Sequence, residues 1–136
     1  EAVHHLTSYR GHAETPHGHS WRVEAELHAA GLDAEGMAYD FVAVKRALDE
    51  LVRPFDHGDL NRVPPFDRLS PTTEHLAAWL LGALRERLPG APVAAVTVWE
   101  GLTARRPVAV RRQRDETTLA GAAARRRGAR GRLPAG

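Results

Sequence analysis

The chain has 136 residues, of which 43% are hydrophobic, and its formal net charge is +2. This length suits one compact domain. The chain has eight histidines and no cysteine, which excludes disulfides and thiolate metal sites, so any transition-metal site must use imidazole or carboxylate ligands. No apolar run approaches the roughly 20 residues that cross a bilayer, and nothing resembles a signal peptide. We therefore expect a cytoplasmic protein with no membrane partner.

The sequence opens at Glu1 rather than at a methionine, and we expect that the first strand begins upstream of this residue. The first clear strand covers residues 21–27, where Trp21, Val23, Ala25 and Leu27 alternate with polar residues. This period of two is typical of a strand with one solvent-exposed face. A turn at residues 31–36 leads to the short apolar run Met37 to Phe41, which predicts a partner strand and a first hairpin.

Two helices are predicted next. Apolar residues from Phe41 to Leu51 follow a helical spacing, with Asp40 placed to cap the first turn and Pro54 placed to end the helix. Residues 55–69 are rich in Pro, Asp, Asn and Gly and predict a long loop, which more often carries function than a short connection does. Ser70 is expected to cap a second helix that ends before Pro89.

Two short β-prone runs, Ala94 to Glu100 and Pro107 to Val110, predict a second hairpin. Because strands and helices segregate along the chain instead of alternating, the pattern indicates an α+β fold in which both helices cover one face of an antiparallel sheet. We place the boundary of this domain at residues 1–110.

The remaining residues, 111–136, form a basic tail. Eight arginines lie between Arg111 and Gly136 against only two acidic residues, so the body of the chain carries a net negative charge. The Ala/Gly/Arg-rich composition of the tail offers little apolar surface to bury, which predicts disorder. A role in binding RNA or an acidic partner is the alternative. Nucleic acid is the less favoured partner, because no stacking aromatic residues accompany the charges.

The histidines carry the strongest chemical signal. His17 and His19 are two residues apart at the entry to the predicted strand, so both rings point to one face. An antiparallel return of the preceding segment would bring His4 alongside them, whereas His5 would face away. Three neutral imidazoles leave a fourth position open, which is the arrangement of a catalytic zinc site. The alternative is that these are surface histidines that are close only by chance.

At this point the sequence resembles the family of pterin-making lyases that includes 6-pyruvoyl- and 6-carboxy-tetrahydropterin synthases. The run Glu1 to Leu6 is similar to the family segment F-x-A-A-H-x-L without its opening Phe, and residues 17–19 match H-G-H. Three more segments follow in family order: residues 36–41 resemble G-M-x-x-D-F, residues 55–61 resemble L-D-H-x-x-L-N, and residues 70–77 resemble N-P-T-x-E-x-L-A. Trp99-Glu100 resembles the strand end that carries the pterin-anchoring glutamate of the family.

The resemblance implies a fold and an assembly. The fold is the T-fold, with a four-stranded antiparallel sheet and two helices on one face. Subunits would join their sheets into a homo-oligomer, commonly a hexamer, with active sites between neighbouring subunits.

The resemblance also implies roles for individual residues. His4, His17 and His19 would bind Zn²⁺. Asp56 and His57 would form a carboxylate–imidazole pair that moves protons, although a solvated pair without a catalytic role is the alternative. Glu100 would accept paired hydrogen bonds from the pterin ring, although a salt bridge to Arg105 or Arg106 is the alternative.

The sequence departs from the family at two positions. Ala13 stands where family members carry a catalytic Cys, and Glu14 follows it, so that residues 14–19 resemble the E-x-x-H-G-H of a subgroup in which glutamate replaces the cysteine. That subgroup makes 6-hydroxymethyl-7,8-dihydropterin for folate synthesis. Glu14 is therefore the candidate base, the alternative being a polar loop residue of a protein without activity. Gly101 replaces the Thr that follows the anchoring glutamate in the family.

Three functional hypotheses follow. The first is a zinc-dependent lyase acting on 7,8-dihydroneopterin triphosphate, with Glu14, Asp56 and His57 as its catalytic residues. The second is a catalytically silent protein that binds a pterin or purine ring or assembles with active copies of the family. A 6-carboxy-tetrahydropterin synthase-like role in a deazapurine pathway such as that of queuosine is the alternative to the first reaction. The third makes the basic tail the functional element.

Overall fold

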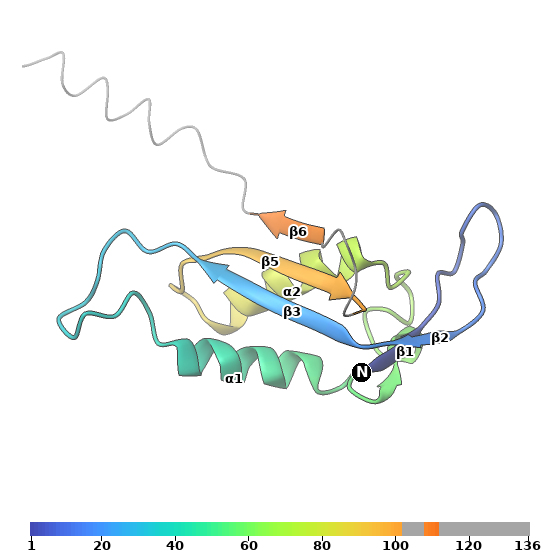
Figure 1. Ribbon diagram of the computed structural model, residues 1–136, viewed down its shortest axis with the longest axis horizontal. Coiled ribbons are helices and arrows are strands. Elements are labelled where there is room, and N and C mark those ends of the chain that lie inside the picture. The colour runs from blue at the N-terminus through green and yellow to red at the C-terminus, as the bar shows by residue number, and fades with distance from the viewer. Residues whose placement is uncertain (102–107, 112–136) are drawn as a thin grey trace, which may run out of the picture.

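The computed structural model of the protein describes residues 1–101 and 108–111. Their elements are shown in Figure 1 and are, in chain order, β1 (Ala2–His4), β2 (His17–His19), β3 (Trp21–Leu27), α1 (Phe41–Val52), β4 (Gly58–Asp59), the 3-10 helix η1 (Leu60–Arg62), α2 (Thr73–Arg87), β5 (Val93–Glu100) and β6 (Val108–Arg111). The basic tail after Arg111 lies outside the described residues, as do Arg105 and Arg106. The disorder of the tail therefore stays a prediction.

The strands form two small sheets. In one sheet β5 lies between β3 and β6, and all neighbours are antiparallel. In the other sheet β1 pairs antiparallel with β2 and parallel with β4. Only Ser20 separates β2 from β3. The predicted α+β class is confirmed, with the strands divided between an antiparallel sheet and a small mixed one.

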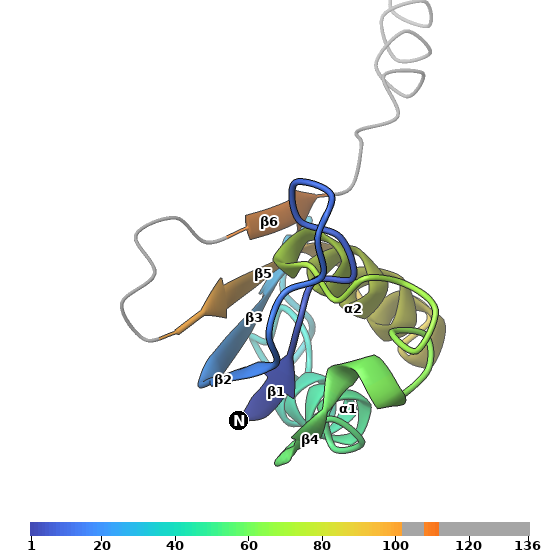
Figure 2. The ribbon, with the colours of Figure 1, turned by 90° about the vertical axis from the view of Figure 1, so that its right-hand side faces the viewer.

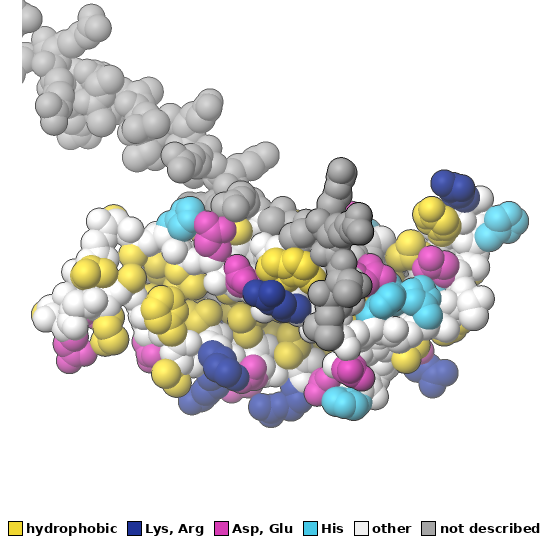
Figure 3. All heavy atoms as spheres, viewed as in Figure 1, with side chains coloured by type: hydrophobic (Ala, Val, Ile, Leu, Met, Phe, Trp, Pro, Cys, Tyr) yellow, Lys and Arg dark blue, Asp and Glu magenta, His cyan; other side chains and the backbone are white. Residues whose placement is uncertain are grey.

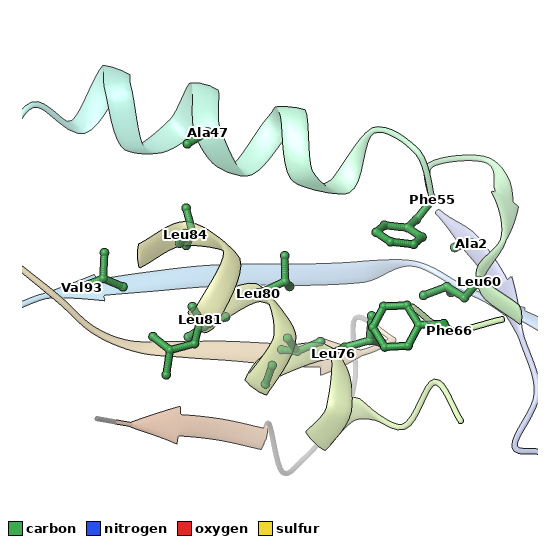
Figure 4. Packing of buried hydrophobic residues seen from close by; sticks show 13 residues of the cluster. Ala2, Ala47, Phe55, Leu60, Phe66, Leu76, Leu80, Leu81, Leu84 and Val93 are labelled. Carbon is green, nitrogen blue, oxygen red and sulfur yellow. The ribbon is translucent and has the colours of Figure 1, made fainter. Parts of the chain in front are cut away.

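Both helices lie on the same face of the sheet formed by β3, β5 and β6, as Figure 2 shows. The core lies between the helices and this sheet (Figure 4). Its members are apolar side chains of α1, α2, β5 and the loop that joins the helices, and the most deeply buried are Leu60, Phe66, Ala77, Leu80, Leu84, Ala95, Val96 and Val98. In the part of the chain that the structure describes, neither helix is long and apolar enough to span a membrane.

The loop between the helices is anchored by aromatic side chains. Phe55, Phe66 and Trp79 meet edge to face in all three pairs, with ring centroids 5.4 to 5.7 Å apart. This geometry suits the quadrupoles of aromatic rings. The predicted long loop at residues 55–69 thus contains β4 and η1 and is held firmly on α2.

The helix caps are partly as predicted. Asp40 caps α1 by accepting hydrogen bonds from the backbone N–H groups of Val42 and Ala43 at 2.8 and 3.3 Å. The cap of α2 was predicted at Ser70, which is wrong. Thr72 is the cap, since its hydroxyl accepts the backbone N–H of His75 at 3.1 Å and its own backbone is extended. The helix therefore begins after the Ser-Pro pair.

The predicted first hairpin is also wrong, because residues 37–41 contain no strand and β3 pairs with β5 instead. The reason is local polar chemistry. The Asp33 side chain accepts the backbone N–H groups of Glu35 and Met37, both at 2.9 Å, and the Asp33 N–H donates to the carbonyl of Met37. These bonds close a loop on itself, so its backbone groups are not available to a neighbouring strand.

Candidate metal centre

The pairing of β1 with β2 brings three histidines to one place. In the antiparallel register His4 lies opposite His17, and Ala2 lies opposite His19. The ring centroid of His4 is 4.7 Å from that of His17 and 5.5 Å from that of His19, and the centroids of His17 and His19 are 4.9 Å apart. His17 and His19 share one face of β2 because side chains alternate along a strand. The predicted convergence of the three rings is therefore present, and Figure 3 shows histidine side chains side by side near β2.

A carboxylate joins the three rings. The Oε1 atom of Glu100 lies 3.1 Å from Nε2 of His4 and 3.0 Å from Nε2 of His19. One potential ligand atom from each of His4, His17, His19 and Glu100 lies within 4.8 Å of all the others. We call these four residues the histidine–glutamate cluster. It is the only group of this kind in the described residues, so Glu14, Asp56 and His57 do not belong to it.

Hydrogen bonds to backbone carbonyls orient two of the rings. Nδ1 of His4 lies 3.1 Å from the carbonyl oxygen of Pro71, and Nδ1 of His17 lies 2.8 Å from that of Thr15. A carbonyl oxygen can only accept, so we assign the proton of each ring to Nδ1. In the neutral ring Nε2 then carries a lone pair and faces the other ligand atoms. Such a Nδ1–H to carbonyl bond is the usual support of a metal-binding histidine.

The cluster fits a zinc ion. Zinc is bound tetrahedrally by imidazole nitrogen and carboxylate oxygen at about 2.0 to 2.2 Å, which sets its ligand atoms roughly 3.4 Å apart. Separations of up to 4.8 Å need only small side-chain movements to reach this geometry. With the proton of a neutral His4 ring on Nδ1, the Nε2 lone pair faces Glu100 Oε1, and a cation between these two acceptors would satisfy both. These residues therefore suit a metal ion, and their role as ligands stays a prediction.

The surroundings of the cluster differ from side to side. His4 is only 2% exposed, and the indole of Trp21 packs edge-on against it with ring centroids 4.8 Å apart. The side chains of His19 and Glu100 are 31% and 34% exposed. The cluster is thus closed where His4 faces the core and open to solvent at His19 and Glu100.

Thr73 supports Glu100 in a way that the sequence did not reveal. The Thr73 hydroxyl donates to the second carboxylate oxygen of Glu100, Oε2, at 3.0 Å. Thr73 is the first residue of α2, and Glu100 is the last residue of β5. The start of this helix and the end of this strand therefore fix the carboxylate beside the histidines.

Glu14 binds the backbone of Leu6 and is not part of the cluster. Its backbone N–H donates to the carbonyl of Leu6 at 3.0 Å, and its side-chain Oε2 accepts the backbone N–H of Leu6 at 3.2 Å. Leu6 and Glu14 thus pair at the base of the loop between β1 and β2. In this conformation the Glu14 carboxylate binds backbone, and a change of side-chain rotamer would be needed to turn it toward the histidines.

Asp56 and His57 contact each other, as the sequence suggested. Nδ1 of His57 lies 3.0 Å from Oδ1 of Asp56, and His57 has the left-handed backbone angle φ of 57° that lets neighbouring side chains meet.

The Asp56–His57 pair does not lie in the histidine–glutamate cluster. The backbone N–H of His57 donates to the carbonyl of Glu1, which is three residues from His4, or about 10 Å of strand. The His57 side chain is also 78% exposed. The pair therefore lies beside the start of β1, outside the cluster, and its imidazole faces solvent.

A separate hollow of about 450 Å³ lies between α1 and the sheet. Apolar side chains form most of its lining, including Val23, Leu48, Val52, Phe55 and Leu80. No residue of the histidine–glutamate cluster lines it. Trp21, which packs against His4, is one of its lining residues, so the hollow borders the cluster without including it.

Comparison with known proteins gives one consistent result. The sequence profile described as 6-pyruvoyl tetrahydropterin synthase matches residues 1–112. A dihydroneopterin monophosphate aldolase of Pyrococcus furiosus is 33% identical over 89 residues, which are 65% of this chain and 73% of that protein. A 6-carboxy-5,6,7,8-tetrahydropterin synthase of Synechocystis is 37% identical over 97 residues, which are 66% of this chain and 73% of that protein.

A solved structure agrees in fold. The 6-pyruvoyl tetrahydropterin synthase of Caenorhabditis elegans superposes with a TM-score of 0.65 at 21% sequence identity, covering 72% of this chain and 70% of that one. The predicted T-fold is therefore confirmed.

Proposed function

Since the chain belongs to the 6-pyruvoyl tetrahydropterin synthase family, we propose that it is a zinc-dependent lyase that acts on the side chain of a dihydroneopterin, such as 7,8-dihydroneopterin triphosphate. The observation that carries the proposal is the histidine–glutamate cluster, in which three imidazoles and a carboxylate meet at one accessible point. Relatives named as a pterin aldolase and as a tetrahydropterin synthase support the class of substrate.

Each residue of the site has a proposed task. His4, His17 and His19 hold the zinc ion, which makes the hydroxyls of the substrate side chain and the neighbouring C–H bonds more acidic. Glu100 accepts two parallel N–H groups of the pterin ring, a match that a carboxylate makes well. Glu14 takes up a proton from the substrate side chain. For that task its carboxylate must leave the backbone N–H of Leu6, to which it is now bound.

Asp56 and His57 of a neighbouring subunit return a proton to the substrate side chain. The exposure of His57 and the absence of the pair from the cluster within the described residues of its own chain support this arrangement. We propose a homo-oligomer, with a hexamer as the favoured form, in which the pair of one copy faces the cluster of the next. A closed symmetric assembly of this kind repeats one interface.

The product that we favour is 6-hydroxymethyl-7,8-dihydropterin, on the route to folate, because Glu14 replaces the cysteine. The relative named as an aldolase supports cleavage of the side chain. The relative named as a 6-carboxy-5,6,7,8-tetrahydropterin synthase favours a deazapurine route as the second candidate. We propose a cytoplasmic location for either route.

The direct test is to incubate the zinc-loaded full chain with 7,8-dihydroneopterin triphosphate and to identify the products by mass. We expect 6-hydroxymethyl-7,8-dihydropterin. The Glu14→Gln variant should lose a factor of about 10² to 10⁴ in kcat while its zinc affinity is unchanged. No turnover, together with pterin binding that Glu100→Ala abolishes, would instead identify a silent pterin-binding protein.

The shared site has its own test. His17→Ala and His57→Ala should each be inactive alone, because each lacks one half of every site. When the two variants are unfolded together and refolded, mixed oligomers should recover activity, since some sites then combine an intact cluster with an intact Asp56–His57 pair. A mixture that stays inactive while forming mixed oligomers would mean that the pair acts within its own chain or not at all.

A further inference from the structure

Both oxygens of the Glu100 carboxylate already have partners and do not face outward as a pair toward a pterin ring. Oε1 lies between the Nε2 atoms of His4 and His19, at 3.1 and 3.0 Å. Oε2 accepts the hydroxyl of Thr73 at 3.0 Å. The anchoring role proposed above requires both oxygens to face the pterin. The observed conformation and the proposed substrate-bound conformation therefore exclude each other.

The observed conformation is suited to metal binding. One carboxylate oxygen of Glu100 already lies within 4.8 Å of a ring nitrogen atom of each histidine, and a carboxylate oxygen is an ordinary zinc ligand. Three imidazoles and one carboxylate complete a tetrahedral shell, so a metal bound here would have no vacant position. Such a closed site is typical of a structural zinc, whereas a catalytic zinc keeps one position for water or substrate.

We infer that Glu100 is the fourth protein ligand of the metal in the substrate-free protein and that a pterin opens the coordination shell by drawing Glu100 away. When the pterin binds, its N–H groups replace the metal as the partners of the carboxylate, and a water molecule or a substrate hydroxyl takes the vacated position. The metal therefore has four ligands both before and after the pterin binds. The inference rests on the proposed function only for the identity of the ring that competes for Glu100.

Thr73 is the positioning residue of this exchange. Its hydroxyl holds Oε2 and so turns Oε1 toward the histidines. The chain offers matched variants for testing this role. Thr73→Ser keeps the hydroxyl and Thr73→Val removes it at nearly constant volume. Glu74→Ala removes the same charge as Glu100→Ala, from an exposed residue that does not belong to the cluster.

The first measurement is zinc affinity of the full chain by competition with a chelator. We expect Glu100→Ala and Glu100→Gln to raise the zinc Kd at least tenfold and Thr73→Val to raise it about threefold to tenfold. Thr73→Ser and Glu74→Ala should stay within twofold of the wild type. A zinc Kd within twofold of the wild type in both Glu100 variants would overturn the inference, and circular dichroism would establish that the variants are folded.

The second measurement uses cobalt in place of zinc and pterin without a side chain (2-amino-4-hydroxypteridine) as the probe, because this ring has no side-chain hydroxyl to offer the metal. We expect the pterin to change the visible absorption of the wild-type cobalt protein as water replaces a carboxylate, and to leave that of Glu100→Ala unchanged. An unchanged wild-type spectrum at saturating pterin would contradict the exchange.

These outcomes separate the inference from the proposed function. A Glu100→Ala protein that keeps its zinc affinity but loses turnover would refute the metal contact and leave the pterin anchor standing. A Glu100→Ala protein with weakened zinc affinity, beside a wild type that turns over no dihydroneopterin, would support the metal contact and refute the proposed reaction.

Discussion

Replacement of His4 or of His5 by alanine tests the candidate metal centre most directly, because His4 belongs to the histidine–glutamate cluster and the adjacent His5 does not. His4 is 2% exposed and its Nε2 atom belongs to the histidine–glutamate cluster. The His5 ring does not reach the cluster, and its Nδ1 atom is buried without a hydrogen-bond partner in the described residues. The two variants thus remove the same side chain from two neighbouring positions, only one of which faces the metal.

The expected loss of zinc affinity in His4→Ala can be estimated from the effect of removing a metal ligand. Loss of a residue that merely supports a metal ligand costs about 10- to 100-fold in affinity, so loss of the ligand His4 should cost at least about 100-fold, or roughly 2.7 kcal/mol. At a zinc concentration about 1,000 times the wild-type Kd, binding stabilises the folded wild type by about 4.1 kcal/mol. The same concentration is only about ten times the Kd of His4→Ala and stabilises it by about 1.4 kcal/mol.

The assay is thermal unfolding of each variant with excess chelator and with zinc, followed by circular dichroism. A difference of about 2.7 kcal/mol corresponds to roughly 10 °C for a domain of about 110 residues. The zinc-induced rise in Tm should therefore be about 10 °C smaller for His4→Ala than for the wild type, and unchanged for His5→Ala. Comparison of shifts removes the direct cost of truncating a buried side chain. An equal shift in His4→Ala, or a loss of the shift in His5→Ala, would refute the assignment of His4, and not His5, as a metal ligand.

Three predictions concern the fold and are read from the free energy of unfolding in urea, with an unchanged m-value as the control for the unfolded state. Asn61→Ala should cost about 1 to 3 kcal/mol, because the Asn61 amide pairs with both the N–H and the carbonyl of His5, at 2.9 and 3.0 Å; a cost near zero would mean that water replaces it. Phe66→Ala should cost about 3 to 5 kcal/mol, since this ring is 1% exposed and contacts two other aromatic rings, and a smaller cost would show that α2 and the loop close the gap. Asp40→Ala should cost about 1 kcal/mol through loss of the α1 cap, while Asp40→Asn, which keeps an acceptor, should cost less.

The histidine part of the cluster could be predicted because its geometry is local. Alternation along a strand places His17 and His19 on one face, and a short antiparallel return is enough to add His4. The same holds for the α1 helix, whose apolar spacing and Asp40 cap are contained in one stretch of sequence. Interactions between residues near in sequence leave few alternatives to choose between.

The partner of β3 could not be predicted in the same way. Period-two alternation indicates which side chains of a strand face the core, but it does not indicate which other strand lies beside it. The run from Met37 to Phe41 is apolar and near in sequence, whereas the true partner, β5, begins 66 residues after the end of β3. The side-chain bonds of Asp33, which close residues 33–37 into a loop, decide against the nearer choice.

Glu100 was missed as a member of the cluster for the same reason that the first hairpin was wrong. The β3–β5 register places Glu100 opposite Trp21, and Trp21 is two residues from His19. Without that pairing, a carboxylate 96 residues from His4 in sequence has no visible connection to the histidines. Thr73 was missed likewise, since its hydroxyl matters only when the start of α2 lies against the end of β5.

This difference between local and distant contacts has a consequence for metal binding. The hairpin of β1 and β2 brings three imidazoles together by itself, but the carbonyl that orients His4 comes from Pro71 and the carboxylate comes from Glu100. Both arrive only when α2 and β5 have packed on the rest of the domain. The unfolded chain can therefore offer a metal no more than the loosely held histidines, and most of the binding free energy of the full cluster adds to the stability of the folded state. Core substitutions that loosen the contact between α2 and β5 should consequently weaken metal binding even though they touch none of its ligands.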